Sequence, residues 1–198
     1  MVLNMKYPNG VTKQYITFNT YANRGMNLEA DISDSNTYYL NNDIAVIYKK
    51  PTPITIAKVD YPSRIEAVIK EAYFKTPSTT DYNGIYKGKY IDFEAKETKN
   101  KTSFPLNNIH KHQIKHLEKI HNHEGIGFII VRFTTLNETY LLTVEKLTEF
   151  INNNSRQSIP IEYFRKNGHV IKQKYRPLVD YLEIIDKLYF NGGISWTK

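Results

Sequence analysis

The sequence predicts an α/β fold in one domain, and three observations lead to this prediction. Its length of 198 residues is typical of a single domain that can bury a core of useful size. Apolar runs with the two-residue period of strands alternate with segments whose apolar residues follow a helical period. The stretch 49–78 breaks this alternation with Pro51 and Pro53, and it is a candidate projection from the domain.

The N-terminal part is expected to contain an arm, a helix and two strands. Residues 1–20 are polar and contain a turn signal, so we expect a flexible arm that precedes a single domain at 21–198. The apolar spacing over 23–40 fits an amphipathic helix loosely. The β-branched run Ile44–Tyr48 predicts a buried strand, and Ile54–Asp60 predicts a second strand.

One segment cannot be assigned from its periodicity. Residues 61–64 have the composition of a turn. In the segment 65–75 that follows, the apolar residues fit one face of a helix, and they also fit the return strand of a projecting arm. Both alternatives stay open at this point.

A hairpin and a helix are predicted in the central part of the chain. Strands are expected over Thr79–Tyr86 and Lys89–Thr98, because the Lys-Gly pair between them is a compact turn signal. A helix is expected to run through Gln113, with Asn107 or Asn108 as its N-cap.

The C-terminal part alternates between strands and helices. The apolar run Ile126–Phe133 predicts a central strand, and Glu138–Thr143 predicts its neighbour. A short helix is expected over Val144–Ile151 and a polar loop over Asn152–Ser158. A terminal helix is expected over Pro177–Phe190, with its proline in the first turn.

The charge balance favours a polyanionic partner. The chain has 27 Lys and Arg residues against 20 Asp and Glu residues, a net charge of +7 and a pI of about 9.3. This balance favours nucleic acid first and an anionic membrane second. Aromatic residues between the cations suit stacking on unpaired bases, whereas solvated lysine faces and strand-core aromatics are the ordinary alternatives. No run of about 18 apolar residues predicts a transmembrane helix.

Cysteine and histidine usage limits the possible chemistry. The chain has no cysteine, which excludes a disulfide scaffold, a thiolate zinc site and a cysteine nucleophile and fits a reducing cytosol. Among its six histidines, His112 and His116 have the spacing of a helical metal pair. Without cysteine or a suitably placed acid, a polar helix face near phosphates is the better interpretation.

Three charged residues alternate with apolar residues in the strand expected over 89–98. Asp92, Glu94 and Lys96 share one face, because strand residues two apart point the same way, and a short hairpin would bring Asp81 alongside them. Buried charges are costly unless they are paired or bind a metal. Carboxylates and a lysine in this arrangement suit Mg²⁺-assisted phosphodiester hydrolysis. The ordinary alternative is a ladder of acids and lysine on a solvated face.

Longer segments resemble a known family. Asp81, twelve intervening residues and Glu94-Ala95-Lys96 are similar to the core motif of restriction-endonuclease-like nucleases. Where many of those nucleases have proline before the first aspartate, this chain has Thr80, as the RecU family of Holliday junction resolvases does. Four segments resemble that family more specifically: Tyr21–Met26, Ala45–Pro53, Ser78–Gly88 and Ile91–Lys99. The resemblance implies a restriction-endonuclease-like mixed β-sheet flanked by helices, with a protruding stalk.

The resemblance also implies roles for individual residues of the site. Asp81 and Glu94 would hold Mg²⁺, for which Mn²⁺ could substitute. Thr79 and Gln113 would add oxygen ligands to the same ion. Lys96 would be the lysine that stabilises the transition state.

The stalk of the family would correspond to residues at about 51–78. It enters the centre of an opened four-way junction, which favours the strand interpretation of the ambiguous segment. Arg64 and Phe74 match stalk residues for junction recognition, as a cation for phosphates and an aromatic for stacking. A core position is the ordinary alternative for Phe74. Glu29 matches an acidic residue of the first helix and is a possible accessory residue.

The implied function is that of a Holliday junction resolvase, a Mg²⁺-dependent DNA endonuclease that makes paired symmetric nicks in four-way junctions during recombination and repair. A homodimer would supply two matching sites. RecA and a branch-migration helicase would be partners, and we expect a cytoplasmic, nucleoid-associated protein with no membrane partner. The alternatives are a restriction-type or repair nuclease on the same fold and a non-catalytic basic DNA-binding protein.

Overall fold

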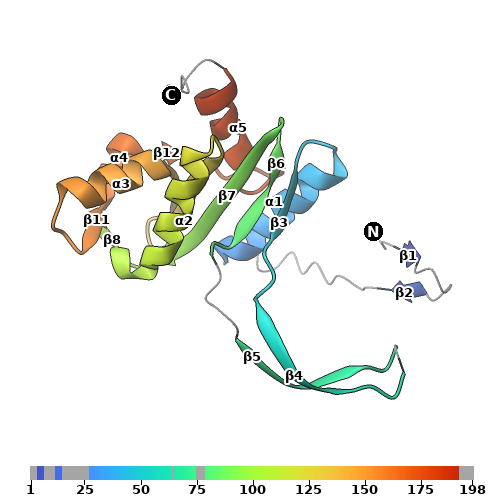
Figure 1. Cartoon of the computed structure of the whole chain (residues 1–198). Helices are drawn as coiled ribbons and strands as arrows, with labels where there is room; N and C mark the ends of the chain where they lie inside the picture. Colours follow the sequence, from blue (N-terminus) through green and yellow to red (C-terminus); the bar gives the residue numbers. More distant parts are fainter. Residues whose placement is uncertain (1–3, 7–11, 15–26, 64, 75–78, 192–198) are drawn as a thin grey trace.

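The computed structural model describes residues 4–6, 12–14, 27–63, 65–74 and 79–191 (Figure 1). It confirms the α/β fold. A six-stranded sheet has the order β12-β10-β9-β7-β6-β3. Its strands are β3 (Val46–Lys49), β6 (Tyr82–Tyr86), β7 (Lys89–Thr98), β9 (Ile126–Phe133), β10 (Glu138–Thr143) and β12 (His169–Val170). β7 and β9 are parallel and the other neighbours are antiparallel, so the sheet is mixed.

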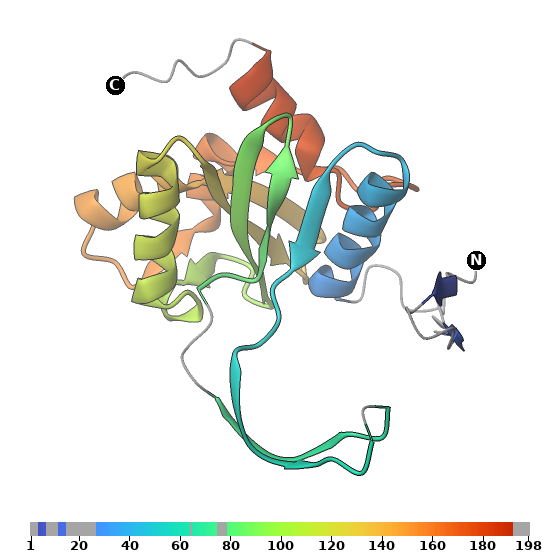
Figure 2. The ribbon, with the colours of Figure 1, turned by 45° about the vertical axis from the view of Figure 1, so that its right-hand side comes forward.

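Helices cover the two faces of this sheet (Figure 2). One face packs against α1 (Leu28–Asn41) and against α5 (Tyr181–Ile185), which continues into a π-helical segment, η3 (Asp186–Phe190). The other face packs against α2 (Lys111–Asn122), α3 (Val144–Asn153) and α4 (Ile161–Asn167). A 3₁₀ turn, η2 (Leu106–Asn108), precedes α2.

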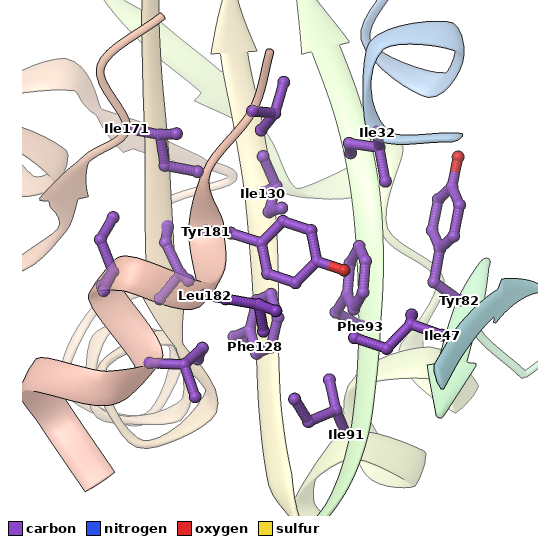
Figure 3. Close-up of a cluster of buried hydrophobic side chains, with 14 of the residues drawn as sticks. Ile32, Ile47, Tyr82, Ile91, Phe93, Phe128, Ile130, Ile171, Tyr181 and Leu182 are labelled. Atoms are coloured by element: carbon purple, nitrogen blue, oxygen red, sulfur yellow. The ribbon is translucent and has the colours of Figure 1, made fainter. Parts of the chain in front are cut away.

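The core on the α1 and α5 side fixes the position of β7. Phe93 stacks between Tyr82 on β6 and Phe128 on β9, with ring centroids 4.8 and 4.7 Å apart. Tyr181 of α5 and Ile32 of α1 cover these rings, as Figure 3 shows. Stacked aromatic pairs contribute beyond their buried area, so this side of β7 is held firmly in the middle of the sheet.

The opposite side of β7 faces α2. Glu94 and Lys96 pair in register with Ile129 and Val131 of β9, and these two apolar residues belong to the core beneath α2, α3 and α4. Neighbours in register lie on the same face of a sheet. The charged residues of β7 therefore lie on the helix α2 side, as the two-residue period predicts.

A two-stranded hairpin projects from this body, as Figures 1 and 2 show. It consists of β4 (Ile54–Asp60) and β5 (Val68–Phe74), which pair antiparallel with each other and with no other described strand. The structure therefore assigns the ambiguous segment as a strand. All residues of both strands are exposed. Isolated hairpins of this kind are marginally stable in water, so this one lacks the support of a core.

The turn between β6 and β7 forms as its sequence predicts. Lys87 and Gly88 have φ angles of 47° and 77°, the left-handed values that a two-residue hairpin turn requires at both positions. This turn sets the register in which Asn83 pairs with Asp92.

Several predicted boundaries are wrong, each for a local reason. β3 is not a buried strand but an edge strand, in which only Ile47 is buried. The N-cap of α2 is His110, because Asn107 and Asn108 belong to the 3₁₀ turn. The terminal helix begins at Tyr181, and not at the proline four residues earlier, because the Asp180 side chain accepts from the N–H of Glu183.

Short elements near the ends of the larger ones were not predicted. β8 (Ser103–Pro105) pairs with β11 (Ser158–Pro160), and α4 lies in a stretch to which no element was assigned. At the N-terminus, β1 (Asn4–Lys6) pairs with β2 (Thr12–Gln14). The rest of the expected arm lies outside the described residues, and its mobility stays a prediction.

Candidate active site

Two carboxylates on the α2 side of β7 are completely buried. Asp92 and Glu94 are both 0% exposed, although a charged carboxylate loses much hydration energy when it is buried. The two carboxylates differ in the partners that compensate for this lost hydration, and this difference distinguishes their roles.

Glu94 lies in a cluster with Lys96 and Asp81. Neither oxygen of Glu94 has a hydrogen-bond donor of good geometry, and its partner is the Lys96 ammonium, which forms an ion pair with Oε1. Lys96 Nζ also lies 3.6 Å from Oδ2 of Asp81, and that oxygen accepts a 3.3 Å hydrogen bond from the backbone N–H of Ala95. The structure thus brings together the three residues that the motif predicts.

This arrangement shifts the pKa values of the cluster. Burial, and secondly the charge of Asp81, raise the pKa of Glu94 to about 7, while Lys96 acts in the opposite direction. Burial tends to lower the pKa of Lys96, but its contacts with Glu94 and Asp81 outweigh this effect and raise that pKa. Glu94 therefore exchanges a proton near neutral pH, while Lys96 stays cationic.

Asp92, in contrast, is saturated with donors. Its Oδ2 atom accepts from Lys50 Nζ at 2.7 Å and from the Tyr90 hydroxyl at 3.0 Å, and it lies 3.1 Å from His116 Nε2. Its Oδ1 atom accepts from the Thr80 hydroxyl. A buried charge with a full set of partners is held in a fixed geometry. Asp92 is therefore suited to positioning its neighbours rather than to binding a ligand.

Two of the Asp92 partners, Lys50 and Thr80, come from the segments on either side of the projecting hairpin, which we call its two roots. Lys50 directly precedes the hairpin segment, and its backbone N–H donates a 2.8 Å hydrogen bond to the carbonyl of Asp81. Thr80 follows the hairpin and directly precedes Asp81, and His116 comes from α2. The network therefore connects both roots of the hairpin to the strand that holds Glu94.

The other predicted site residues have different surroundings. The Thr79 hydroxyl accepts from Lys50 Nζ at 3.1 Å, and Oε1 of Gln113 accepts from the backbone N–H of His110 at 2.9 Å. Glu29 forms an ion pair with Lys49 near the start of α1. No contact of these three residues with Asp81 or Glu94 is present in the described part of the chain. Their roles at the site stay predictions.

The two predicted junction-recognition residues lie on or near the hairpin. Phe74 is 83% exposed at the end of β5 and pairs in register with Ile54, which excludes a core position. Arg64 lies outside the described residues, and so does the segment Tyr21–Met26 that contributes to the family resemblance.

An Mg²⁺ ion fits the Glu94 cluster. Among the described residues, no three His, Cys, Asp or Glu side chains are close enough to hold a metal ion. Mg²⁺, however, binds commonly through one or two carboxylates, waters and the phosphates of its substrate. Apart from the ion pair of Oε1 with Lys96, the oxygens of Glu94 have no hydrogen-bond donor among the described residues and lie beside Asp81, so a hard cation would satisfy them.

The sequence did not indicate the partners of Asp92. Its position two residues before Glu94 places it on the site face, which was a usable signal. Lys50, Thr80 and His116 lie 42, 12 and 24 positions away from it in the chain. Only the tertiary fold brings such residues together.

The Asp92 network leads to a stability prediction. We expect Asp92→Ala to lower the free energy of unfolding by about 3–5 kcal/mol, because it leaves the nearly buried Lys50 ammonium without its counter-ion. Asp60→Ala is the matched control, since the Asp60–Lys70 pair is more than half exposed and should contribute less than about 1 kcal/mol. Urea unfolding of both variants provides the measurement. Equal losses would show that Asp92 has no special structural role.

Comparison with known proteins identifies the family. The family model described as "RecU: Recombination protein U" matches residues 23–187. Proteins named Holliday junction resolvase RecU are 50% identical in Bacillus mycoides and 53% identical in Geobacillus sp.. These alignments cover 96% and 94% of this chain and 100% and 98% of the two relatives. The Staphylococcus aureus protein of the same name is 53% identical, over 93% of this chain and 96% of its own. In the described part of the chain, no helix is long and apolar enough to span a membrane. With nearly the whole chain matched at half identity or better, this protein belongs to the RecU family.

Proposed function

We propose that this protein is a Holliday junction resolvase, a metal-dependent endonuclease that makes paired symmetric nicks in four-way DNA junctions. The observation that supports it most directly is the buried Glu94 carboxylate, which lies beside Asp81 and has the Lys96 ammonium as its one charged partner among the described residues. The close relatives named Holliday junction resolvase RecU supply the substrate.

Asp81 and Glu94 would hold Mg²⁺, or Mn²⁺ in its place, with Thr79 and Gln113 as further oxygen donors. Bound there, the ion would neutralise charge on the scissile phosphate and acidify an attacking water. Glu94 is placed for this role by β7, whose other face is fixed by the Phe93 stack. Asp81 is placed by the backbone N–H of Ala95 on the same strand.

Lys96 would stabilise the transition state by its charge. Its ammonium forms an ion pair with Glu94 and lies 3.6 Å from Asp81, so it is placed beside the two carboxylates that would hold the ion. A fixed ammonium beside the scissile phosphate stabilises the negative charge that develops in phosphoryl transfer. Lys96 is therefore proposed as an electrostatic catalyst.

The projecting hairpin would recognise the open centre of a junction. Its strands have no cover from the body of the protein, and Tyr73 and Phe74 are 60% and 83% exposed. Exposed aromatics can stack on bases that are unpaired at a branch point. The Asp92 network joins both roots of the hairpin to the cleavage site, which would keep the two at a fixed separation.

A homodimer would supply two sites for the two strands of like polarity. An exposed apolar area on β3 and β6, on the sheet face that α2 packs against, supports this proposal. Val46, Tyr48 and Ile85 are 48%, 55% and 57% exposed there, and the pairing of Val46 with Ile85, and of Ile85 with Tyr90, places them on the face of Asp92. A second copy would cover this apolar area with two-fold symmetry. RecA and a branch-migration helicase are proposed as partners in the cytoplasm, at the nucleoid.

A competition assay separates this proposal from its rivals. A mobile four-way junction and a linear duplex of the same sequence, with different labels, compete for limiting enzyme in Mg²⁺. We expect the junction to be cut first, with few cuts in the duplex. Comparable cutting of both would indicate a restriction-type or repair nuclease. Binding of both without any cutting would indicate a non-catalytic DNA-binding protein.

The raised pKa of Glu94 gives a prediction on stability against pH. Because this pKa is about 7 in the folded protein and 4.5 ordinarily, the metal-free folded state binds more protons than the unfolded chain, and stability falls as pH rises through this window. Glu94→Gln removes this loss. The Tm of the variant should exceed that of the wild type by more at pH 8 than at pH 5, by several degrees, since 1 kcal/mol corresponds to about 2–4 °C.

Addition of Mg²⁺ provides the control for that experiment. The ion should raise the Tm of the wild type at pH 8 and leave the Tm of Glu94→Gln nearly unchanged. Parallel pH profiles for the two proteins, or equal effects of Mg²⁺, would contradict the placement of a metal at Glu94.

A further inference from the structure

We propose that three exposed lysines on one side of α2, Lys111, Lys115 and Lys119, bind the phosphate backbone of the duplex arm that leads into the cleavage site. We call them the α2 lysine row. The inference rests on the proposed function and adds to it the surface along which the duplex lies.

The lysines of the row differ from most cations of the protein because they have no acidic partner in the described part of the chain. Most other described lysines and arginines form ion pairs with acidic side chains. The paired residues include Lys49, Lys50, Lys70, Lys87, Lys89, Lys96, Arg132, Lys146, Arg165, Lys174 and Lys187. Cations that the fold does not neutralise are available to neutralise phosphates.

The spacing of the row suits a nucleic-acid strand. Residues four apart lie above one another on a helix surface, and each step advances by about 6 Å along the axis. The three lysines therefore span about 12 Å, which corresponds to three or four phosphates at 3.4 Å each along a strand. All three are exposed, and lysine side chains can adjust their reach to a backbone path.

The row lies on the exposed face of α2, and its Lys119 end borders the cleavage site. Gln113 and Leu117 are the buried residues of this helix, and His116 contacts Asp92 on the site face of β7. Lys119 is three residues after His116, so the two are neighbours on the helix surface. The row therefore reaches the site at Lys119 and runs from there along the exposed face of the helix.

Acidic residues border the row on the side of α2 that faces α3. A cavity of about 420 Å³ separates α2 from α3, and its lining includes Glu118, Glu145 and Glu149. Glu149 is paired with Lys146, but Glu118 and Glu145 would repel a phosphate backbone on that side. The lysine row therefore lies between this acidic surface on one side and the cleavage site, which its Lys119 end borders, on the other.

The salt dependence of DNA binding tests the proposal. Binding of a linear duplex and of a four-way junction is measured without divalent metal, over a range of NaCl concentrations, for the triple variant Lys111→Gln/Lys115→Gln/Lys119→Gln. Each lost phosphate contact should lower the slope of log K against log [salt] by about 0.9. We expect a slope about 2 to 3 units smaller, and affinity about 10- to 10²-fold weaker at 0.15 M salt.

The control removes the same charge from paired lysines elsewhere. Lys146→Gln/Lys174→Gln/Lys187→Gln has the same net charge as the test variant, but each of these lysines has an acidic partner. Its slope should stay within about one unit of the wild-type slope. Equal changes in both triple variants would overturn the proposal, because they would show only a general effect of net charge.

The outcome is independent of whether the protein cleaves junctions. One outcome is a wild type that binds DNA with a slope that the triple variant reduces as expected and yet cuts no junction. That result would overturn the proposed function and leave this surface in place. A protein that cuts junctions, with a slope unaffected by the α2 substitutions, would overturn this surface and leave the proposed function in place.

Discussion

Glu94→Gln is expected to lower the rate of junction cleavage by about 10³-fold, the upper end of the loss for a single charge-stabilising group, while junction affinity without metal stays unchanged. The substitution keeps the size of the side chain and removes the charge that a metal ion needs. Because Glu94 is buried beneath α2, it cannot contribute much to DNA binding by direct contact. Cleavage and binding should therefore separate.

Asp81→Asn and Glu118→Gln complete this experiment. Asp81→Asn should produce a loss of the same order, because Asp81 is the second carboxylate of the cluster. Glu118→Gln is the control, since this acid of α2 lines the cavity toward α3, and its cleavage rate should match the wild type. Cleavage at the wild-type rate by either site variant would rule out the assigned cluster.

Shortening the hairpin is expected to remove the preference for junctions and to leave affinity for linear duplex unchanged. Ile56 and Ala72 pair in register, so Asn-Gly in place of residues 57–71 forms a tight hairpin turn at that pair. The replaced segment contains three cations and three acids, which makes the change neutral in charge. The replaced segment also contains Tyr61, which is 63% exposed, so the ratio of duplex to junction Kd should fall by about 10-fold or more, the value of one lost stacking contact.

Phe74 can be tested separately, because the shortened hairpin retains it. Phe74→Ala should weaken junction binding, and Phe74→Tyr should restore most of it, since a tyrosine ring also stacks. Both proteins, and the shortened one, are measured by competition between junction and duplex. Equal losses on the two substrates would mean that the hairpin adds general affinity and no recognition of the branch point.

Three strands around the site could be predicted to the residue, whereas β6 begins at Tyr82 and not at the predicted Thr79. β7, β9 and β10 have the bounds that the sequence predicts, because alternation and a Lys-Gly turn determine them locally. The segment 65–75 could not be assigned in this way, since its apolar residues satisfy two periods. Its strand conformation depends on pairing with β4.

The site was predictable where it depends on one strand and its hairpin partner. The two-residue period placed Glu94 and Lys96 on one face, and the motif added Asp81. The Asp92 network was not predictable, because Lys50 and His116 approach from other elements only after folding. The edge position of β3 was missed for the same reason, because an apolar run does not show whether the strand has a neighbouring strand on both sides.

Cleavage of a mobile four-way junction by the wild type, with and without Mg²⁺, tests the central claim most directly. The products are mapped on both strands of like polarity. We expect paired nicks at symmetric positions, with 5′-phosphate and 3′-hydroxyl ends, in Mg²⁺ and none in EDTA. Cleavage in EDTA, nicks confined to one strand, or an intact junction in Mg²⁺ would contradict the proposal that the Glu94 cluster holds the metal of a junction resolvase.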